Sequence, residues 1–137
     1  MQSIRFQPVS NLILIPIKVM GIDGNSFRDI EVVLDTGASI TSISTNVASG
    51  LGYDILNPER TEEVITGSGI EELAIIEVTA LTAIGQTVEN IDVMCLDLHP
   101  EIHAEGVLGL NFLLNFDVSI FFSKGIIELV SPELDRF

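Results

Sequence analysis

The junction between an apolar run and a carboxylate constrains the fold of this chain most strongly. The residues from Ile30 to Leu34 are mostly apolar, and Asp35, Thr36 and Gly37 follow them directly. An unpaired carboxylate at the end of a buried strand costs several kcal/mol. Glycine tolerates the backbone angles of a tight loop, and a threonine hydroxyl can hydrogen-bond nearby backbone. The junction therefore predicts a buried strand that ends in a loop arranged around the charge.

Short runs of strand-forming residues, separated by turn signals, cover most of the chain. Its apolar residues are mainly Ile, Leu and Val, which favour strands, and only 6% of all residues are aromatic. We expect strands over residues 4–9, 12–20, 27–34, 40–44, 64–65, 70–81, 87–96, 107–108, 117–122 and 126–130. Short helices are expected over 45–51, capped by Ser44 or Thr45, and over 110–115. This pattern predicts an all-β, barrel-like fold with one or two short helices.

Length and composition favour a single soluble domain over residues 1–137. The chain is 47% hydrophobic, which suffices for a core and is too apolar for disorder. The start of the chain lacks the pattern of a signal peptide, and the run at 12–17 is too short to span a bilayer. Cys95 is the single cysteine, so no internal disulfide forms, and its apolar neighbours predict a buried thiol. We expect a cytoplasmic protein without a membrane segment.

The charge balance excludes two classes of partner. The formal net charge is −14, from 20 acidic and 6 basic residues, and the basic residues are scattered. Binding to nucleic acid or to an anionic membrane needs clustered Lys and Arg, so we expect neither. The acidic surface keeps an apolar protein soluble, and it would also attract basic peptides.

Two other patterns resemble functional sites but lack features that such sites need. His99 and His103, with Asp97 and Glu105 beside them, invite a metal-site interpretation, but Pro100 lies between the histidines and favours a polar surface loop. The segment 67–69 lacks the outer glycine spacing of a serine-hydrolase elbow and the Lys of a phosphate-binding loop. We expect neither a metal ion nor a cofactor.

Three segments, taken in order, resemble the single-lobe, retropepsin-like aspartic protease family. A predicted hairpin over 12–34 leads into the sequence Asp-Thr-Gly-Ala-Ser at 35–39. A glycine-tipped hairpin follows, and the segment 106–113, Gly-Val-Leu-Gly-Leu-Asn-Phe-Leu, closes the pattern. Asp-Thr-Gly alone is a weak signal, whereas the three segments in this order are specific. The resemblance spans about residues 12–130.

The resemblance implies a fold and an activity. The fold would be a retropepsin-like acid-protease barrel, closed or partly open, with a flap hairpin and one lobe per chain. The activity would be hydrolysis of peptide bonds in a peptide or protein substrate, by a water activated between two carboxylates. Since the motif occurs once, the active enzyme would be a symmetric homodimer that pairs Asp35 of each subunit. The alternative is a catalytically inactive module of the same fold that dimerises or binds a partner.

The resemblance also assigns roles around Asp35. Thr36 would hydrogen-bond across the dimer, and Gly37 would bring a backbone N–H close to the carboxylates. Ala38 would be small because the two loops nearly touch, and the Ser39 hydroxyl would support the carboxylate from behind.

Two further segments complete the implied site. Thr66, Gly67, Ser68 and Gly69 would form the flap tip over the substrate. Val107, Leu108 and Gly109 would pass beneath the Asp35 loop and hold it from the core side. Leu110 stands where retroviral members commonly have Arg, and the flap carries acidic residues at 71 and 72, so this chain departs from the retroviral branch. The candidate interface segments are 1–7 and 135–137.

Overall fold

Strands account for most of the structure, a computed structural model that describes residues 2–9 and 11–132. The strands are β1 (Gln2–Arg5), β2 (Pro8–Val9), β3 (Leu12–Met20), β4 (Phe27–Leu34), β5 (Thr41–Ile43), β6 (Arg60–Thr66), β7 (Gly69–Ala83), β8 (Gln86–Cys95), β9 (Gly106–Leu108), β10 (Asp117–Phe121) and β11 (Ile126–Val130). The helices are α1 (Thr45–Gly50) and α2 (Leu110–Leu113), with a 3-10 turn η1 (Pro100–Ile102). The all-β prediction with two short helices is confirmed.

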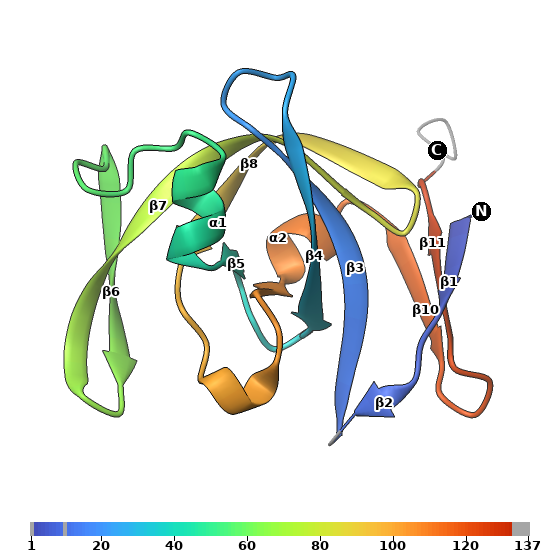
Figure 1. Ribbon diagram of the computed structural model, residues 1–137. Coiled ribbons are helices and arrows are strands. Elements are labelled where there is room, and N and C mark those ends of the chain that lie inside the picture. The colour runs from blue at the N-terminus through green and yellow to red at the C-terminus, as the bar shows by residue number, and fades with distance from the viewer. Residues whose placement is uncertain (1, 10, 133–137) are drawn as a thin grey trace.

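The main sheet curls back on itself (Figure 1). Its strand order is β2-β3-β4-β9-β5-β8-β7-β6, and β3 also pairs with β7, through Ile17 opposite Ala83 and Val19 opposite Leu81. A separate three-stranded sheet, β1-β11-β10, lies at the right of the view. The sheets are arranged like a ring and do not form a clear barrel, and the all-β fold class expected from the sequence is confirmed.

The core fills the inside of this ring. Strands contribute alternating apolar side chains to it, as the period of two requires. The largest side chains that are almost completely buried include Ile15, Val32, Ile43, Leu108 and Phe112. Cys95 is buried as predicted, and burial raises the pKa of its thiol to about 11. The thiol is therefore protonated at neutral pH and is a packing residue.

Strand β9 determines where the Asp35 loop lies. It runs parallel to β4, with Val107 opposite Val33, and antiparallel to β5, with Val107 opposite Ser42. The two strands that flank the loop are thus separated by a third strand from much later in the chain. Gly106 permits this insertion, because a Cβ there would lie 2.2 Å from the Ser42 carbonyl oxygen.

Helix α1 follows the expected boundaries. Ser44, not Thr45, is its N-cap, and the Ser44 hydroxyl accepts a hydrogen bond from the Val47 amide at 3.3 Å. Thr45 instead bonds to the Asp97 carboxylate through both its amide and its hydroxyl. The sequence predicted that Ser44 or Thr45 would cap the helix. Ser44 is the cap because Thr45 is bound to Asp97, which lies far along the chain.

The expected strand over 4–9 is wrong in its middle. β1 ends at Arg5, and Phe6 is buried while its amide donates to the Gly125 carbonyl at 2.8 Å. The expected loop before β9 also contains η1, where His99 Nδ1 accepts a hydrogen bond from the Glu101 amide at 3.2 Å. Of the candidate interface segments, Met1 and 135–137 lie outside the described residues. Within the described ranges, no helix is long and apolar enough to cross a membrane.

Candidate functional site

Asp35 lies in the loop between β4 and β5. Its amide donates to the Leu108 carbonyl at 3.1 Å, which fastens the start of the loop to β9. The Gly37 amide donates to Asp35 Oδ1 at 2.8 Å, and the Ala38 amide donates to the Asp35 carbonyl at 3.2 Å. These bonds hold one carboxylate oxygen in place and leave the other free of backbone donors in this loop.

The carboxylate is exposed, although the strand that carries it is buried. Val32, Val33 and Leu34 are all buried, and Asp35 is open to solvent in the single chain. The desolvation expected from the sequence is therefore absent in one subunit. Within residues 2–9 and 11–132, the fold leaves this carboxylate uncovered.

The segment 107–110 lies alongside the loop. The Leu110 amide donates to the Ala38 carbonyl at 2.8 Å. Gly109 packs so closely that a Cβ there would lie 2.8 Å from the Ala38 oxygen and 2.8 Å from the Ile40 carbonyl carbon and oxygen. The structure thus brings together the predicted loop and the predicted supporting segment through backbone contacts, which only glycine permits at this point.

A buried polar network, which the sequence analysis missed, braces the same loop. Thr41 is fully buried, and its hydroxyl accepts a hydrogen bond from the Gly109 amide at 3.0 Å. Asn111 Oδ1 accepts from the Thr41 amide and from the Thr41 hydroxyl, both at 2.8 Å. Asn111 Nδ2 donates to the Asp92 carbonyl at 2.7 Å. No local spacing signals the contact, since Thr41 and Asn111 are 70 residues apart.

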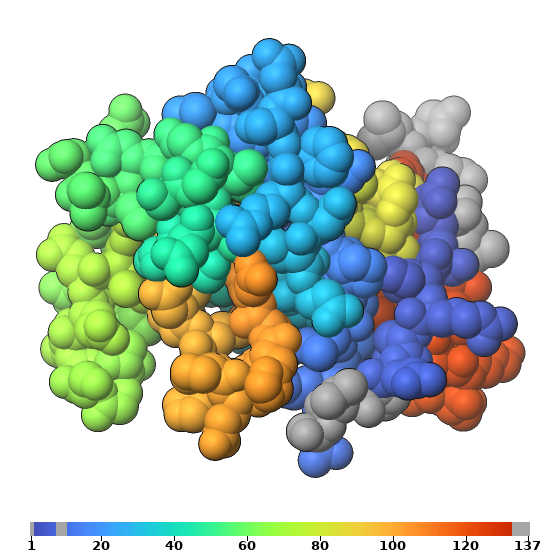
Figure 2. All heavy atoms as spheres, in the orientation of Figure 1, coloured from blue at the N-terminus to red at the C-terminus, as the bar shows by residue number. Residues whose placement is uncertain are grey.

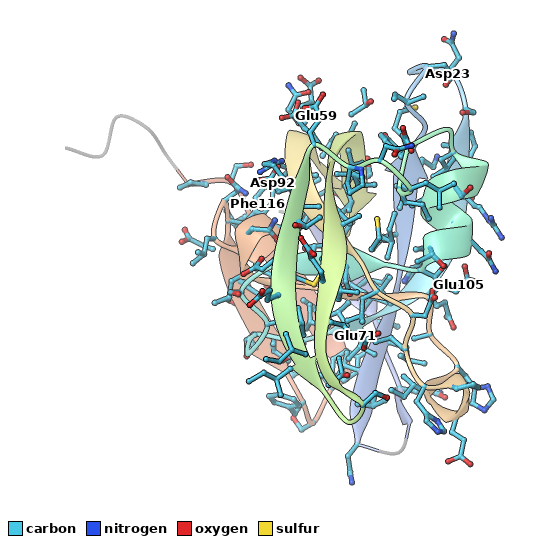
Figure 3. The ribbon with its side chains drawn as sticks, turned by 90° about the vertical axis from the view of Figure 1, so that its left-hand side faces the viewer. Asp23, Glu59, Glu71, Asp92, Glu105 and Phe116 are labelled. Carbon is cyan, nitrogen blue, oxygen red and sulfur yellow. The ribbon has the colours of Figure 1, made fainter. Side chains whose placement is uncertain are left out.

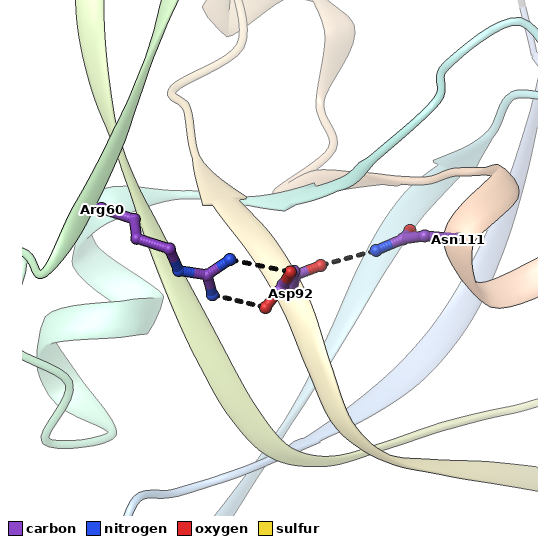
Figure 4. Close-up of polar contacts among 3 residues, drawn as sticks. All are labelled: Arg60, Asp92 and Asn111. Atoms are coloured by element: carbon purple, nitrogen blue, oxygen red, sulfur yellow. Dashed lines mark hydrogen bonds and ion pairs between the residues drawn. The ribbon is translucent and has the colours of Figure 1, made fainter.

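The network ends at an ion pair on the surface (Figure 4). Arg60 Nη1 and Nη2 donate to the two carboxylate oxygens of Asp92 at 3.0 and 2.5 Å. The hydrogen bonds from Arg60 lower the pKa of Asp92 below its usual value of 3.8. Arg60 therefore favours the ionised form of the Asp92 carboxyl.

The predicted flap tip forms the turn between β6 and β7. The Thr66 hydroxyl accepts from the Ser68 amide and donates to the Gly69 carbonyl, each at 3.2 Å, and Gly69 has a φ of +115°. Ile65 and Ile70, which pair across the hairpin, are 85% and 71% exposed. The hairpin projects to the left of the Asp35 loop in Figure 1, and a notch separates it from the loop around η1 in Figure 2.

Two hollows lie in this part of the molecule, one beside the Asp35 loop and one at the root of the β6–β7 hairpin. A hollow of about 340 Å³ touches the Asp35 loop through Thr36, and its other walls come from α2 and β10. Its rim includes Leu114, which is 76% exposed. A larger, more polar hollow of about 540 Å³ lies at the root of the β6–β7 hairpin and contains no residue of the Asp35 loop.

Two other predicted residues of the Asp35 loop face solvent in the single chain. Thr36 and Ser39 are exposed, so the cross-dimer bond of Thr36 and the supporting hydroxyl of Ser39 stay predictions. Across 2–9 and 11–132, no three His, Cys, Asp or Glu side chains gather as they would around a metal ion.

Comparison with known proteins places this arrangement among its relatives. The model of one protein family, described as gag-polyprotein putative aspartyl protease, matches residues 20–115. The crystal structure of a retropepsin-like aspartic protease from Rickettsia conorii is similar, with a TM-score of 0.69 and 24% identity over 93% of this chain and 89% of that one. The solution structure of simian foamy virus (mac) protease gives a TM-score of 0.46 and 14% identity over 70% of this chain and 86% of that one. A search of curated protein sequences found no match.

Proposed function

The chain belongs to the gag-polyprotein putative aspartyl protease family, and from this premise we propose that it is an aspartic endopeptidase active as a symmetric homodimer. The observation that carries the proposal is the Asp35 loop. Its carboxylate is presented to solvent at the end of a buried strand, with one oxygen held by the Gly37 amide. Aspartic protease chemistry needs two carboxylates at one water, and each chain supplies one Asp-Thr-Gly.

The mechanism follows from the charge of the pair. Two carboxylates about 3 Å apart cannot both ionise easily, because their like charges repel, and the aspartic protease dyad is the known example of this repulsion. One keeps a proton, and the pair titrates as a unit. The ionised Asp35 takes a proton from water, which attacks the scissile carbonyl, while the protonated Asp35 of the second subunit donates to the carbonyl oxygen. No covalent intermediate with the protein forms.

The surroundings of Asp35 support a second subunit at this face. Thr36 is exposed directly beside the carboxylate, and the hollow next to it is lined mainly by apolar side chains of α2 and β10. Leu114 stands exposed at its rim. Apolar surface of this kind is covered in most stable assemblies. A two-fold axis through the loop would cover it and bring the two Asp35 side chains together.

The β6–β7 hairpin suits the role of a flap. Its tip contains Gly67 and Gly69, and beyond the adjacent residues no atom of the described part of the chain lies within 4 Å of where a Cβ would stand at either of them. Ile65 and Ile70 present apolar side chains to solvent beside the tip. Closure of two such hairpins over the dimer would exclude water and hold an extended peptide as an added strand.

The proposal is tested by hydrolysis of an unbiased peptide library across about pH 3 to 8. Wild type is compared with Asp35→Asn and with Asp29→Asn, a matched exposed carboxylate on β4, and a pepstatin-type inhibitor is added in a second arm. We expect cleavage by wild type and Asp29→Asn, and loss of cleavage with Asp35→Asn or inhibitor. Absence of cleavage at every pH, from protein shown to be a folded dimer, would contradict the proposal and favour a non-catalytic dimerisation or peptide-binding module.

A further inference from the structure

The root of the β6–β7 hairpin is held by more than strand pairing. Among the strands that the structure describes, β6 is the last of its sheet and pairs only with β7, from Arg60 opposite Ile75 to Thr66 opposite Gly69. An edge strand that joins one neighbour and ends in a glycine turn has few constraints on its angle to the rest of the sheet. The one ion pair among residues 2–9 and 11–132 lies at the first residue of this strand.

That ion pair reaches across a strand. Arg60 on β6 contacts Asp92 on β8, and β7 runs between them, with Glu77 directly opposite Asp92. Figure 3 labels Glu59 and Asp92 toward the root of the hairpin and Glu71 further along it. The guanidinium uses two nitrogens on two oxygens, which fixes direction as well as distance. The contact therefore restrains β6 against β8 independently of β7.

Asp92 also belongs to the network that braces the Asp35 loop. Its backbone carbonyl accepts the Asn111 Nδ2 hydrogen bond at 2.7 Å, and Asn111 bonds to Thr41. One residue thus contacts the hairpin with its side chain and the loop support with its backbone (Figure 4). The root of the hairpin and the carboxylate loop are positioned from the same point on β8.

The charges around the pair favour its persistence in mild acid. Asp92, and more weakly Glu77 and Glu59, raise the pKa of Arg60, and Arg60 lowers the pKa of Asp92. A carboxyl whose pKa is lowered on folding contributes its stabilisation above its unfolded pKa and loses it as the pH falls through its folded pKa. The contact is therefore present above the usual Asp value of 3.8 and is lost as the pH falls through the lowered pKa of Asp92.

We propose that Arg60 and Asp92 are positioning residues that set the angle of the flap hairpin relative to the Asp35 loop. The expected effect on peptide hydrolysis rests on the proposed function. The expected effect on the position of the hairpin rests on the structure alone. The pair contacts neither the substrate nor the reacting atoms, so it acts on substrate binding through the hairpin and leaves the chemical step to Asp35.

The test uses the variants Arg60→Gln and Asp92→Asn. Arg28→Gln is the matched control, since Arg28 is exposed on β4 and its substitution removes the same charge as Arg60→Gln. An exposed ion pair shifts a local opening equilibrium by a few-fold. We therefore expect the rate of amide hydrogen exchange over residues 61–74 to rise about two- to five-fold in both variants. In peptide hydrolysis we expect KM to rise by a similar factor and kcat to stay within about two-fold. The control should match wild type in both measurements.

The charge-swapped double variant, Arg60→Asp with Asp92→Arg, separates a specific contact from general destabilisation. We expect it to restore exchange and KM toward wild-type values. Unchanged exchange in the single variants, a loss confined to kcat, or no recovery in the swapped pair would each overturn the proposal. If wild type hydrolyses no peptide, the proposed function fails, and the exchange measurements alone still decide whether the pair positions the hairpin.

Discussion

At the scale of single residues, the Asp35 loop is built from backbone contacts that tolerate little added volume. Gly109 illustrates this, because a Cβ added there would meet the Ala38 and Ile40 carbonyls. Its φ of −107° is ordinary, so the demand for glycine is steric and not conformational. Close packing at such a point leaves a side chain no direction in which to relax.

Gly109→Ala is accordingly expected to destabilise the fold. Its Cβ would stand 2.8 Å from backbone atoms that cannot move independently, and overpacking of this kind costs about 1–3 kcal/mol. The measurement is the midpoint of urea denaturation at fixed protein concentration. Gly67→Ala is the control, since a Cβ there meets no atom within 4 Å, and equal stability of the two variants would contradict the account.

Individual residues also show what a sequence can and cannot reveal about the site. Asp35 was predictable because the residues that define the motif are adjacent in the sequence, a carboxylate followed by a hydroxyl and a glycine. Asn111 was not, since its role depends on Thr41, which is 70 residues away in the chain. A side chain that braces a loop through three-dimensional contacts leaves no periodic or local mark.

At the scale of elements, one aromatic hydroxyl bridges β3 and β7 beside the point where these strands close the sheet. Tyr53, which follows α1, is only 6% exposed. Its hydroxyl donates to the Met20 carbonyl at 2.6 Å and accepts from the Thr79 amide at 3.1 Å. These groups lie at the end of β3 and within β7, beside the point where the two strands meet.

Tyr53→Phe is expected to lower the free energy of unfolding by about 1–3 kcal/mol, because two backbone groups lose a buried partner. Thr82→Val, which removes only the exposed hydroxyl pair between Thr82 on β7 and Thr87 on β8, is expected to change the free energy of unfolding by less than about 0.5 kcal/mol. Urea denaturation monitored by circular dichroism measures both. A Tyr53→Phe variant as stable as wild type would show that the hydroxyl does not contribute to closure.

Element boundaries were predictable where the sequence alternates and turns are marked by glycine. β3, β4 and β11 match the expected ranges for this reason. The break after Arg5 was not predictable, because Phe6 turns inward to bond with Gly125 at the other end of the chain. The position of β9 between β4 and β5 is likewise a property of the assembled sheet.

At the scale of the whole molecule, the acidic charge opposes the association that the proposed chemistry requires. Each chain has a formal net charge of −14, so a dimer would carry twice that charge. Repulsion between the subunits is screened by salt, since the Debye length falls from about 10 Å at 0.1 M to about 3 Å at 1 M. Protonation of carboxylates in mild acid reduces the same repulsion.

Dimer affinity is therefore expected to increase with ionic strength and with mild acidification. Sedimentation velocity at pH 7, with salt raised from about 0.05 to about 0.5 M, should show a decrease of the dimer dissociation constant. A second series from pH 7 to about pH 5 at low salt should show the same direction. A dissociation constant that ignores both variables would contradict this electrostatic account.

The central claim is that one catalytic site is shared by two chains, and a subunit-mixing experiment tests it most directly. Wild type and Asp35→Asn are mixed at constant total concentration, well above the dimer dissociation constant, and peptide hydrolysis is measured against the wild-type fraction. If both carboxylates are needed, heterodimers are inactive, and an equal mixture retains about one quarter of the wild-type activity. Activity that falls in proportion to the wild-type fraction, to about one half at equal mixing, would show that each chain works alone and would contradict the account.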